Sequence, residues 1–249
     1  MKLAIIGYGR MGHMIEEIAK HRGHKIVCVI DAENPDDFNT PAFREADVAI
    51  EFTTPGTAVD NILKSFASKV PVVCGTTGWL DALPDIKALC DKGEGTLLYA
   101  SNFSIGVNLF MAVNRYLASL MDEFPEYVPS MTEIHHIHKL DHPSGTAITL
   151  AEDLVERVTR LDSWEEPAEG KESGKNVLPI AHERVGEVPG THIITWDSPV
   201  DKITISHEAK SREGFVLGAV KAAEWLKDKK GYHTISDMLS DVTHTKGIF

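Results

Sequence analysis

The chain has 249 residues, of which 43% are hydrophobic and 25% are charged, and this composition allows a globular core spread over two domains. Its formal net charge of −12 argues against nucleic acid or an anionic membrane surface as a partner, because no basic cluster is available to meet phosphates. No uncharged apolar run approaches the ~20 residues that span a bilayer. The three cysteines form no CxxC pair, so we expect free thiols and a cytoplasmic location.

Short apolar runs alternate with helical patterns along the N-terminal part of the chain. We expect strands at 2–6, 25–30, 46–52, 70–74 and 96–100, and helices at 12–22, 57–66 and 81–90. Strands that are apolar on both faces and alternate with helices are typical of a parallel sheet covered on both sides. This part therefore predicts an α/β, Rossmann-like domain.

The pattern changes after residue 103. We expect helices at 107–120, 147–158 and 215–227, an extended segment at 130–139, a polar loop at 162–176, and alternating segments within 177–208. Alternation of apolar and polar residues favours antiparallel strands. The sequence thus predicts an α+β domain that is inserted into the first domain or follows it.

A glycine-rich loop lies between the first expected strand and the first expected helix. The residues Gly7-Tyr8-Gly9-Arg10-Met11-Gly12 match the pattern G-x-G-x-x-G. In such loops the first glycine permits a tight turn, the second lets a pyrophosphate approach the backbone, and the third lets the helix pack closely. The N–H groups at the helix start favour phosphate. We therefore predict dinucleotide binding; the alternative is a glycine-rich turn in an unrelated α/β protein.

An acidic residue follows at the end of the second expected strand, where dinucleotide-binding proteins hold the ribose. Asp31 occupies this position, and Ala32 and Glu33 follow it rather than an arginine. A carboxylate accepts hydrogen bonds from a ribose 2′-OH and repels a 2′-phosphate, which favours NADH. Arg10 could still reach a phosphate, so NADPH stays open.

The segment 133–147 carries the densest chemistry in the chain. If its first part is a strand, one face presents Glu133, His135, Ile137 and Lys139, and the other presents His136 and His138. If it is a helix, His135 and Lys139 still share a face, although Asp141 and Pro143 disfavour a continuous helix. Either arrangement brings an imidazole and an ammonium group toward one pocket.

Ser144, Gly145 and Thr146 stand just before a helical run, with Ser144 as a candidate N-cap. The free N–H groups of a helix start suit a carboxylate, so the segment fits an anionic substrate that receives a proton. One alternative is a solvated structural strand. Another is a metal site made of Glu133, His135, His136 and His138, but adjacent histidines on a strand diverge and no H-E-x-x-H is present. We expect no metal there.

Residues 133–147 closely resemble the signature E-x-H-H-x-x-K-x-D-x-P-S-G-T-A of the dihydrodipicolinate reductase family. Further stretches resemble the same family in the same order, and they are found at 9–12, 52–55, 75–78, 101–108, 184–186, 189–192 and 215–225. The resemblance therefore covers nearly the whole chain.

The resemblance implies a cofactor domain made of 1–103 and 213–249 and a domain at 104–212 that binds substrate and forms a homotetramer. It implies that His135 is a proton donor and acceptor and that Lys139 is a proton donor. The implied substrate contacts are His136, Ser144, Gly145 and Thr146. The implied cofactor contacts, beyond residues 7–12 and Asp31, are Gly75, Thr76, Thr77, Ala100, Ser101, Asn102 and Phe103.

The activity implied by the resemblance is the NAD(P)H-dependent reduction of a small cyclic imine dicarboxylate, (2S,4S)-4-hydroxy-2,3,4,5-tetrahydrodipicolinate, to (S)-2,3,4,5-tetrahydrodipicolinate, in lysine and diaminopimelate biosynthesis. The alternatives are a Rossmann dehydrogenase of another small anionic substrate and a non-enzymatic NAD(P) sensor. The chain departs from the family pattern in three ways. Its first glycine loop is one residue shorter than in many members, His142 stands where alanine is usual, and Ile137 stands where a polar residue is common.

Overall fold

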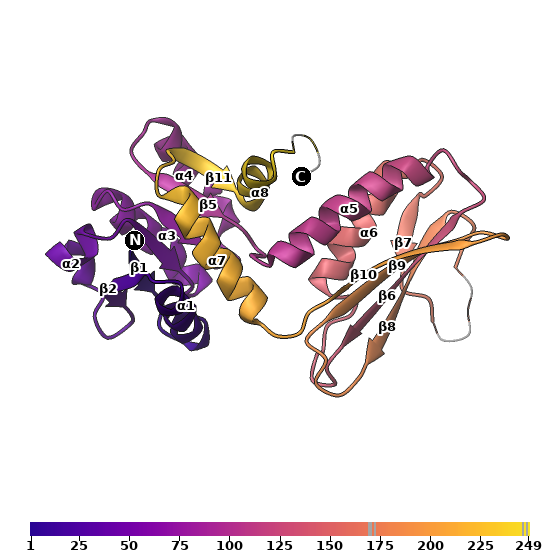
Figure 1. The fold of residues 1–249 in the computed structure, drawn as a ribbon, viewed down its shortest axis with the longest axis horizontal. Coiled ribbons are helices and arrows are strands. Elements are labelled where there is room, and N and C mark those ends of the chain that lie inside the picture. Colours follow the sequence, from indigo (N-terminus) through magenta and orange to yellow (C-terminus); the bar gives the residue numbers. More distant parts are fainter. Residues whose placement is uncertain (169–170, 172, 246, 248) are drawn as a thin grey trace. The chain divides into compact units, whose positions relative to one another are not determined.

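The computed structural model describes every residue except 169, 170, 172, 246 and 248, and Figure 1 shows its elements. The chain divides into two compact units. The first comprises Met1–Ile105 with Glu213–Gly247, and the second comprises Gly106–Arg212. Each unit has its own sheet and its own hydrophobic core.

The first unit is built on a parallel sheet in the order β11-β5-β4-β3-β1-β2. Its strands are β1 (Lys2–Ile6), β2 (Lys25–Ile30), β3 (Val48–Glu51), β4 (Val72–Cys74), β5 (Thr96–Tyr99) and β11 (Gly231–Thr234). Strands β3, β4 and most of β1 are buried on both faces, which explains their continuous apolar sequences.

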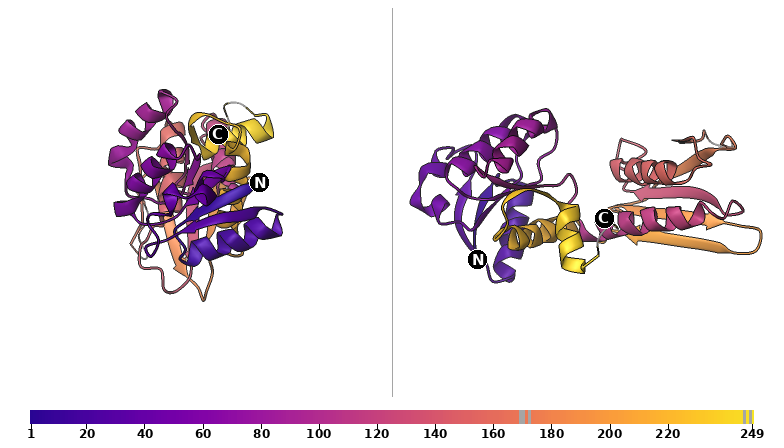
Figure 2. Two further views of the ribbon diagram at one scale, coloured as in Figure 1. Left: turned by 90° about the vertical axis from the view of Figure 1, so that its left-hand side faces the viewer. Right: turned by 90° about the horizontal axis from the view of Figure 1, so that it is seen from above.

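Helices cover both faces of this sheet (Figure 2). They are α1 (Arg10–His21), α2 (Pro41–Arg44), α3 (Pro55–Ala67), α4 (Leu83–Asp91), α7 (Glu213–Leu226) and α8 (Ile235–Thr243), with short 3₁₀ turns η1 (Asp37–Asn39) and η2 (Leu80–Ala82). One face packs α1, α7 and α8 against alternate strand residues such as Leu3 and Ile50. The other face packs α3 and α4 against residues such as Val72 and Leu97.

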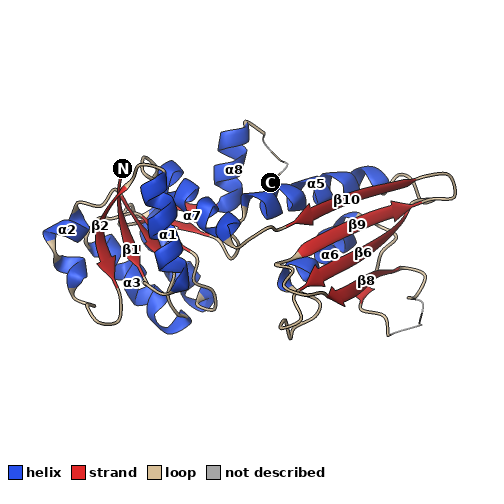
Figure 3. Cartoon of the chain, turned by 60° about the horizontal axis from the view of Figure 1, so that its bottom comes forward, coloured by secondary structure: helices blue, strands red, loops and turns tan. Residues whose placement is uncertain are grey.

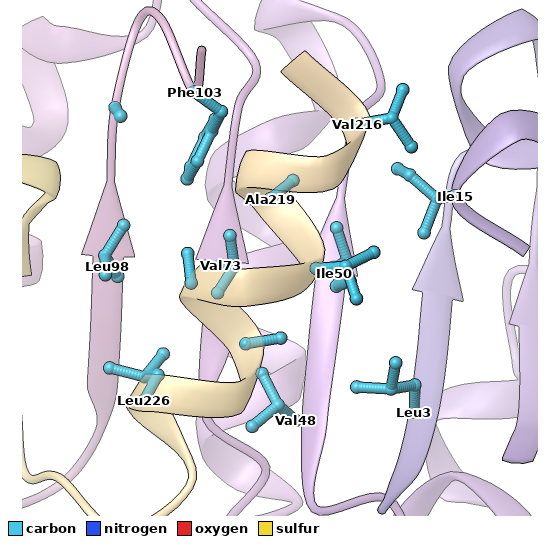
Figure 4. Close-up of a cluster of buried hydrophobic side chains, with 14 of the residues drawn as sticks. Leu3, Ile15, Val48, Ile50, Val73, Leu98, Phe103, Val216, Ala219 and Leu226 are labelled. Atoms are coloured by element: carbon cyan, nitrogen blue, oxygen red, sulfur yellow. The ribbon is translucent and has the colours of Figure 1, made fainter. Parts of the chain in front are cut away.

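Helix α7 lies directly on the sheet because its contact face consists largely of small residues. Figure 4 shows Val216, Ala219 and Leu226 of α7 in one buried cluster with Ile50, Val73 and Leu98 of the strands. A Cβ atom added to Gly218 would lie 1.7 Å from the carbonyl oxygen of Phe103, so only glycine fits there. Helix α7 is therefore fixed against the segment that follows β5.

The second unit is a mixed sheet in the order β10-β9-β6-β8-β7, with two helices on one face (Figure 3). The strands are β6 (Val128–His135), β7 (Ser163–Glu165), β8 (Val177–Arg184), β9 (Thr191–Asp197) and β10 (Lys202–Glu208), and the helices are α5 (Ile105–Met121) and α6 (Gly145–Arg157). Alternate residues of β6, β8 and β9, such as Met131, Ile180 and Trp196, meet apolar residues of both helices in one core.

The predicted fold class, a Rossmann-like parallel sheet with helices and a second α+β part, is confirmed. The strand expected at 130–139 is wrong at its end, because β6 stops at His135 and the N–H of Lys139 closes a turn on the carbonyl of His136. Lys139 is therefore not on the strand face of Glu133 and His135.

The expectation of antiparallel strands across 177–208 holds for β9 and β10 but is wrong for β8, which pairs in parallel with β6 and β7. The loop expected at 162–176 contains strand β7, and its residues 169, 170 and 172 lie outside the described residues. Strand β11 and helix α8 were not predicted, because a partly buried strand of sequence GYHT has no clear alternation. In the described part of the chain, no helix has the length and apolar character needed to cross a bilayer.

The close contact at Gly218 predicts that a side chain at this position destabilises the fold. Gly218→Ala should lower the free energy of unfolding by about 1–3 kcal/mol, the usual cost of overpacking, because the new methyl group meets backbone that cannot move aside. Gly56→Ala is the matched control, since Gly56 is also helical and a Cβ there meets nothing within 4 Å; it should be neutral or stabilising. Denaturant unfolding measures both, and a Gly218→Ala variant as stable as the wild type would contradict the contact.

Candidate active site

The glycine loop follows β1 and is shaped by two close backbone approaches. Gly7 has φ +91°, and a Cβ there would lie 2.1 Å from the carbonyl oxygen of Phe52. A Cβ on Gly12 would lie 2.2 Å from the carbonyl oxygen of Gly7. These positions need glycine for the tight turn and for the close start of α1, which supports the roles expected for the first and third glycines.

The start of α1 faces open space. Gly9 is the N-cap residue and α1 has no side-chain cap, so first-turn N–H groups remain available. A Cβ on Gly9 would meet nothing within 4 Å. A dinucleotide phosphate fits this arrangement, because the backbone donors are accessible and the helix dipole favours an anion.

A pocket of about 340 Å³ adjoins this helix start. Its lining comes from the loops after β1, β3 and β4, and the residues are Gly9, Arg10, Met11, Phe52, Thr53, Pro55, Gly75, Thr76 and Thr77. The chain runs from β1 to β2 on one side and continues with β3 on the other side of β1. The pocket therefore lies at the switch point of the strand order, where open α/β sheets bind their ligands.

The β3 and β4 loops hold each other in place beside the pocket. The N–H of Thr53 donates to Thr76 Oγ1 at 2.7 Å, and Trp79 Nε1 donates to the Thr76 carbonyl at 2.7 Å. A Cβ on Gly75 would lie 2.2 Å from the ring of Phe52. Phe52, Thr53 and Pro55 were not predicted as cofactor contacts, although their segment matched the family pattern.

The other predicted cofactor residues lie at the same edge of the sheet but do not line this pocket. Asp31 directly follows β2, where its Oδ1 accepts from the N–H of Ala32 at 2.9 Å. After β5, Ala100 and Phe103 are buried, and Ser101 is exposed. The other predicted cofactor residues that do not line the pocket are Gly7, Tyr8, Gly12 and Asn102.

The core face of the second sheet becomes polar at one end. On neighbouring strands, Glu133 of β6 lies in register with His182 of β8 and His192 of β9. Two residues earlier on β6, Met131 lies in register with Ile180 and Ile194, which are all core residues. A polar cluster therefore occupies the end of the core.

Glu133 is the centre of this cluster and is fully buried. Its Oε2 accepts from the backbone N–H of Ser144 at 2.9 Å, and its Oε1 accepts from Arg184 Nη2 at 3.1 Å. Burial raises the pKa of Glu133, but the Ser144 and Arg184 donors outweigh it, so the pKa lies below its ordinary value. The carboxylate is therefore charged near neutral pH.

His135 lies on the same strand face and is almost fully buried. Its Nδ1 is 3.3 Å from Glu133 Oε2 without the alignment of a hydrogen bond. Its ring meets that of His192 edge-on at 5.3 Å. Burial, with the positive charges of Lys139 and Arg184, lowers the pKa of His135 despite the attraction of Glu133.

Ser144 connects this cluster to α6 and confirms the predicted N-cap. Its Oγ accepts from the N–H of Ala147 at 3.2 Å and lies 3.1 Å from His192 Nε2. Gly145 and Thr146 then form the first turn, whose N–H groups precede the first intrahelical bonds. Burial and the neighbouring His135 lower the pKa of His192 to about 4, so its imidazole is neutral near neutral pH.

The remaining predicted residues of the segment lie in the turn after β6. Lys139 is partly buried, and its Nζ donates to Asp141 Oδ2 at 2.6 Å. His136 Nδ1 is buried and has no hydrogen-bond partner among the described residues. The structure does not assemble the alternative metal set of Glu133, His135, His136 and His138, because His138 is exposed and contacts Glu187 at 3.0 Å.

Arg184 and His192 were not predicted as part of the site. Arg184 Nε donates to the carbonyl of Lys139 at 3.3 Å and its Nη2 donates to that of Asp141 at 2.9 Å, so it also holds the turn. Both segments matched the family pattern, which was the available signal. Their position depends on strand pairing between residues far apart in sequence.

A glycine loop at the switch point of a parallel sheet, together with a buried imidazole cluster in a second unit, is typical of NAD(P)-dependent oxidoreductases. Solved structures agree on the fold. A dipicolinate-bound dihydrodipicolinate reductase from Paenisporosarcina sp. TG-14 superposes with a TM-score of 0.74 at 23% identity, covering 94% of this chain and 97% of the other. An amine dehydrogenase from Mycobacterium smegmatis gives a TM-score of 0.56 at 10% identity, covering 94% and 95%.

Sequence comparisons give the family. The family models described as dihydrodipicolinate reductase, N-terminus and C-terminus, match residues 1–103 and 106–239. A curated 4-hydroxy-tetrahydrodipicolinate reductase of Christiangramia forsetii is 49% identical over 97% of this chain and 99% of the relative. One of Archaeoglobus fulgidus is 34% identical over 96% and 100%. The chain therefore belongs to the dihydrodipicolinate reductase family.

The low pKa of His192 predicts acid sensitivity. Because the pKa in the folded state, about 4, is below the ordinary value of 6.5, the neutral side chain favours folding above pH 6.5, and this contribution is lost as the pH falls toward 4. Between pH 7 and pH 4, the free energy of unfolding of the wild type should fall by about 3 kcal/mol more than that of His192→Gln. Denaturant unfolding at both pH values measures the difference, and equal losses would refute the assignment.

Proposed function

We propose that this chain catalyses the NAD(P)H-dependent reduction of (2S,4S)-4-hydroxy-2,3,4,5-tetrahydrodipicolinate to (S)-2,3,4,5-tetrahydrodipicolinate, with release of water, in lysine and diaminopimelate biosynthesis. The observation that carries the proposal is the buried His135 beside Glu133 and the start of α6. The two family models of the reductase together match nearly the whole chain. Residues 1–103 with 213–249 would hold the cofactor, and 104–212 the substrate.

The residues of the first unit fit a pyridine dinucleotide. Gly9 and the uncapped start of α1 would hold the pyrophosphate, and Asp31 would accept from a ribose hydroxyl. When bound, NAD(P)H supplies the hydride of the reduction. Gly75, Thr76 and Thr77, which line the pocket, would contact the nicotinamide end, and residues 100–103 would complete the cofactor contacts.

His135 would provide the proton that the reduction requires. Loss of water across C4 and C5 of the substrate would leave a C4=C5 double bond conjugated with the C6=N imine. Hydride would then add at C4 and the resulting enamine would take a proton at C5, so an acid with a pKa near the working pH is needed. Before substrate binds, burial together with the charges of Lys139 and Arg184 outweighs the attraction of Glu133 and lowers the pKa of this imidazole, so it is neutral. The carboxylates of a bound substrate would favour the imidazolium, because opposite charge nearby raises the pKa of a histidine. Substrate binding would thus load the proton donor.

Cationic groups and backbone amides around His135 would hold the substrate. Lys139 would exchange its contact with Asp141 for a substrate carboxylate, and would serve as a second proton donor. Ser144, Gly145 and Thr146 would offer the helix-start amides to the other carboxylate. His136, whose Nδ1 has no hydrogen-bond partner within the described part of the chain, would also contact the substrate. Holding the substrate ring in a fixed orientation beside the proton donor would lower the barrier to proton transfer.

A coupled assay tests the proposed function directly. Product of dihydrodipicolinate synthase is supplied, and NADH oxidation is followed by absorbance. Reduction supports the proposal, whereas binding of NAD(P)H without turnover would favour a sensor. The family resemblance also leads us to propose a cytoplasmic homotetramer, which light scattering of the purified protein tests.

His135→Ala and Lys139→Ala should each lower kcat by about 10²–10⁴, the range for a lost acid or base group. His138→Ala is the matched control, because this nearby imidazole is exposed and its one polar contact among the described residues is with Glu187; it should retain wild-type kcat. Steady-state kinetics measures all three. Wild-type rates in both His135→Ala and Lys139→Ala would reject the assigned roles.

We further propose that NADH is preferred over NADPH because Asp31 repels a 2′-phosphate. Asp31→Ser should raise kcat/KM for NADPH relative to NADH by about tenfold, as expected for removing one exposed charge near a dianion. Glu33→Gln removes the same charge two residues away and should leave the ratio unchanged. A wild-type enzyme that prefers NADPH would contradict the assignment of Asp31.

A further inference from the structure

A second group of imidazoles and a carboxylate lies beside Glu133, His135 and His192 and shares none of these three residues, although its His182 is in register with Glu133. It consists of His142 from the turn before α6, Glu166 from the segment after β7, and His182 of β8. The two imidazoles are exposed and the carboxylate is partly buried. The mechanism above uses none of these three side chains.

The three side chains converge on one point. His142 Nδ1 lies 2.8 Å and 3.0 Å from the two oxygens of Glu166, and His182 Nδ1 contacts Glu166 Oε1. The two rings stack with centroids 4.2 Å apart and an interplanar angle of 16°. Both rings therefore present the same nitrogen to the same carboxylate.

This geometry suits a transition-metal ion. Two imidazole nitrogens and one carboxylate oxygen form a typical open zinc ligand set, with solvent in the fourth position. Ligand atoms at zinc–ligand distances of 2.0–2.2 Å in a tetrahedron are about 3.3 Å apart, and the ligand atoms here all lie within 4.8 Å of one another.

Two other groups of histidines and carboxylates in the second unit are less suited to bind a metal ion. Glu133, His135 and His192 also lie within 4.8 Å of one another, but the Glu133 oxygens already accept from Ser144 and Arg184. His138 and Glu187 form an exposed pair with one imidazole only. The cluster at Glu166 combines two imidazoles, solvent access and a shared carboxylate.

We propose that His142 Nδ1, His182 Nδ1 and a Glu166 carboxylate oxygen form a surface site for a divalent transition-metal ion of the zinc class. The site joins three segments that are distant in sequence. One of them is the turn between Lys139 and Ser144, which Arg184 also holds through two backbone carbonyls. A bound ion therefore fixes this turn to β8 and to the segment after β7.

The test uses the full chain, freed of metal with a chelator and titrated with zinc against a chromogenic competitor. The wild type should bind about one equivalent of zinc that is lost in variants of the ligands, and Co²⁺ in its place should give the visible absorption of a tetrahedral site. His142→Ala and His182→Ala should each weaken zinc binding by at least about tenfold. His138→Ala is the matched control and should bind zinc as the wild type does.

Thermal unfolding gives a second readout, because an ion that binds only the folded state raises Tm. Zinc should raise Tm of the wild type and of His138→Ala, and have a much smaller effect on the two ligand variants. All three variants should fold, because the substituted side chains are exposed. Absence of saturable zinc binding in the wild type would overturn the proposal. Unchanged binding in both ligand variants, or binding lost only in His192→Gln, would also overturn it, the latter by assigning the ion to the buried cluster.

Discussion

The polar end of the second unit depends on the charged carboxylate of Glu133. A fully buried charge is tolerated only when donors replace its lost water, and here the Ser144 amide and Arg184 do so. The same guanidinium holds the carbonyls of Lys139 and Asp141. One carboxylate thus fixes the beginning of α6, the turn before it and the end of β8, and places a negative charge beside His135 while burial keeps that imidazole neutral.

An equivalent constraint in the first unit is steric rather than electrostatic. Gly7 and Phe52 directly follow the neighbouring strands β1 and β3, and their backbones approach so closely that a side chain at Gly7 is excluded. The ring of Phe52 in turn occupies the space of a Cβ on Gly75. Because strands of a parallel sheet end at the same edge, these contacts bring three loops around one pocket at the switch point.

Features set by local chemistry could be predicted from the sequence. The glycine loop, the helix that follows it and the N-cap at Ser144 each depend on a few adjacent residues. The parallel pairing of β8 and the contact of Arg184 with Glu133 could not be predicted, because they depend on strand order. The contacts of His142 could not be predicted for the same reason. Glu166 and His182 lie beside it only because strand pairing brings β8 and the segment after β7 close to the turn.

The first unit is discontinuous in sequence, with α7 and β11 supplied by the last part of the chain. Its core includes Val216, Ala219 and Leu226 of α7, whereas the second unit is one continuous stretch. During synthesis, which proceeds from the N-terminus, residues 106–212 can therefore complete their core before the ribosome has made the helix that the N-terminal sheet still lacks. The domain that begins first is the one that finishes last.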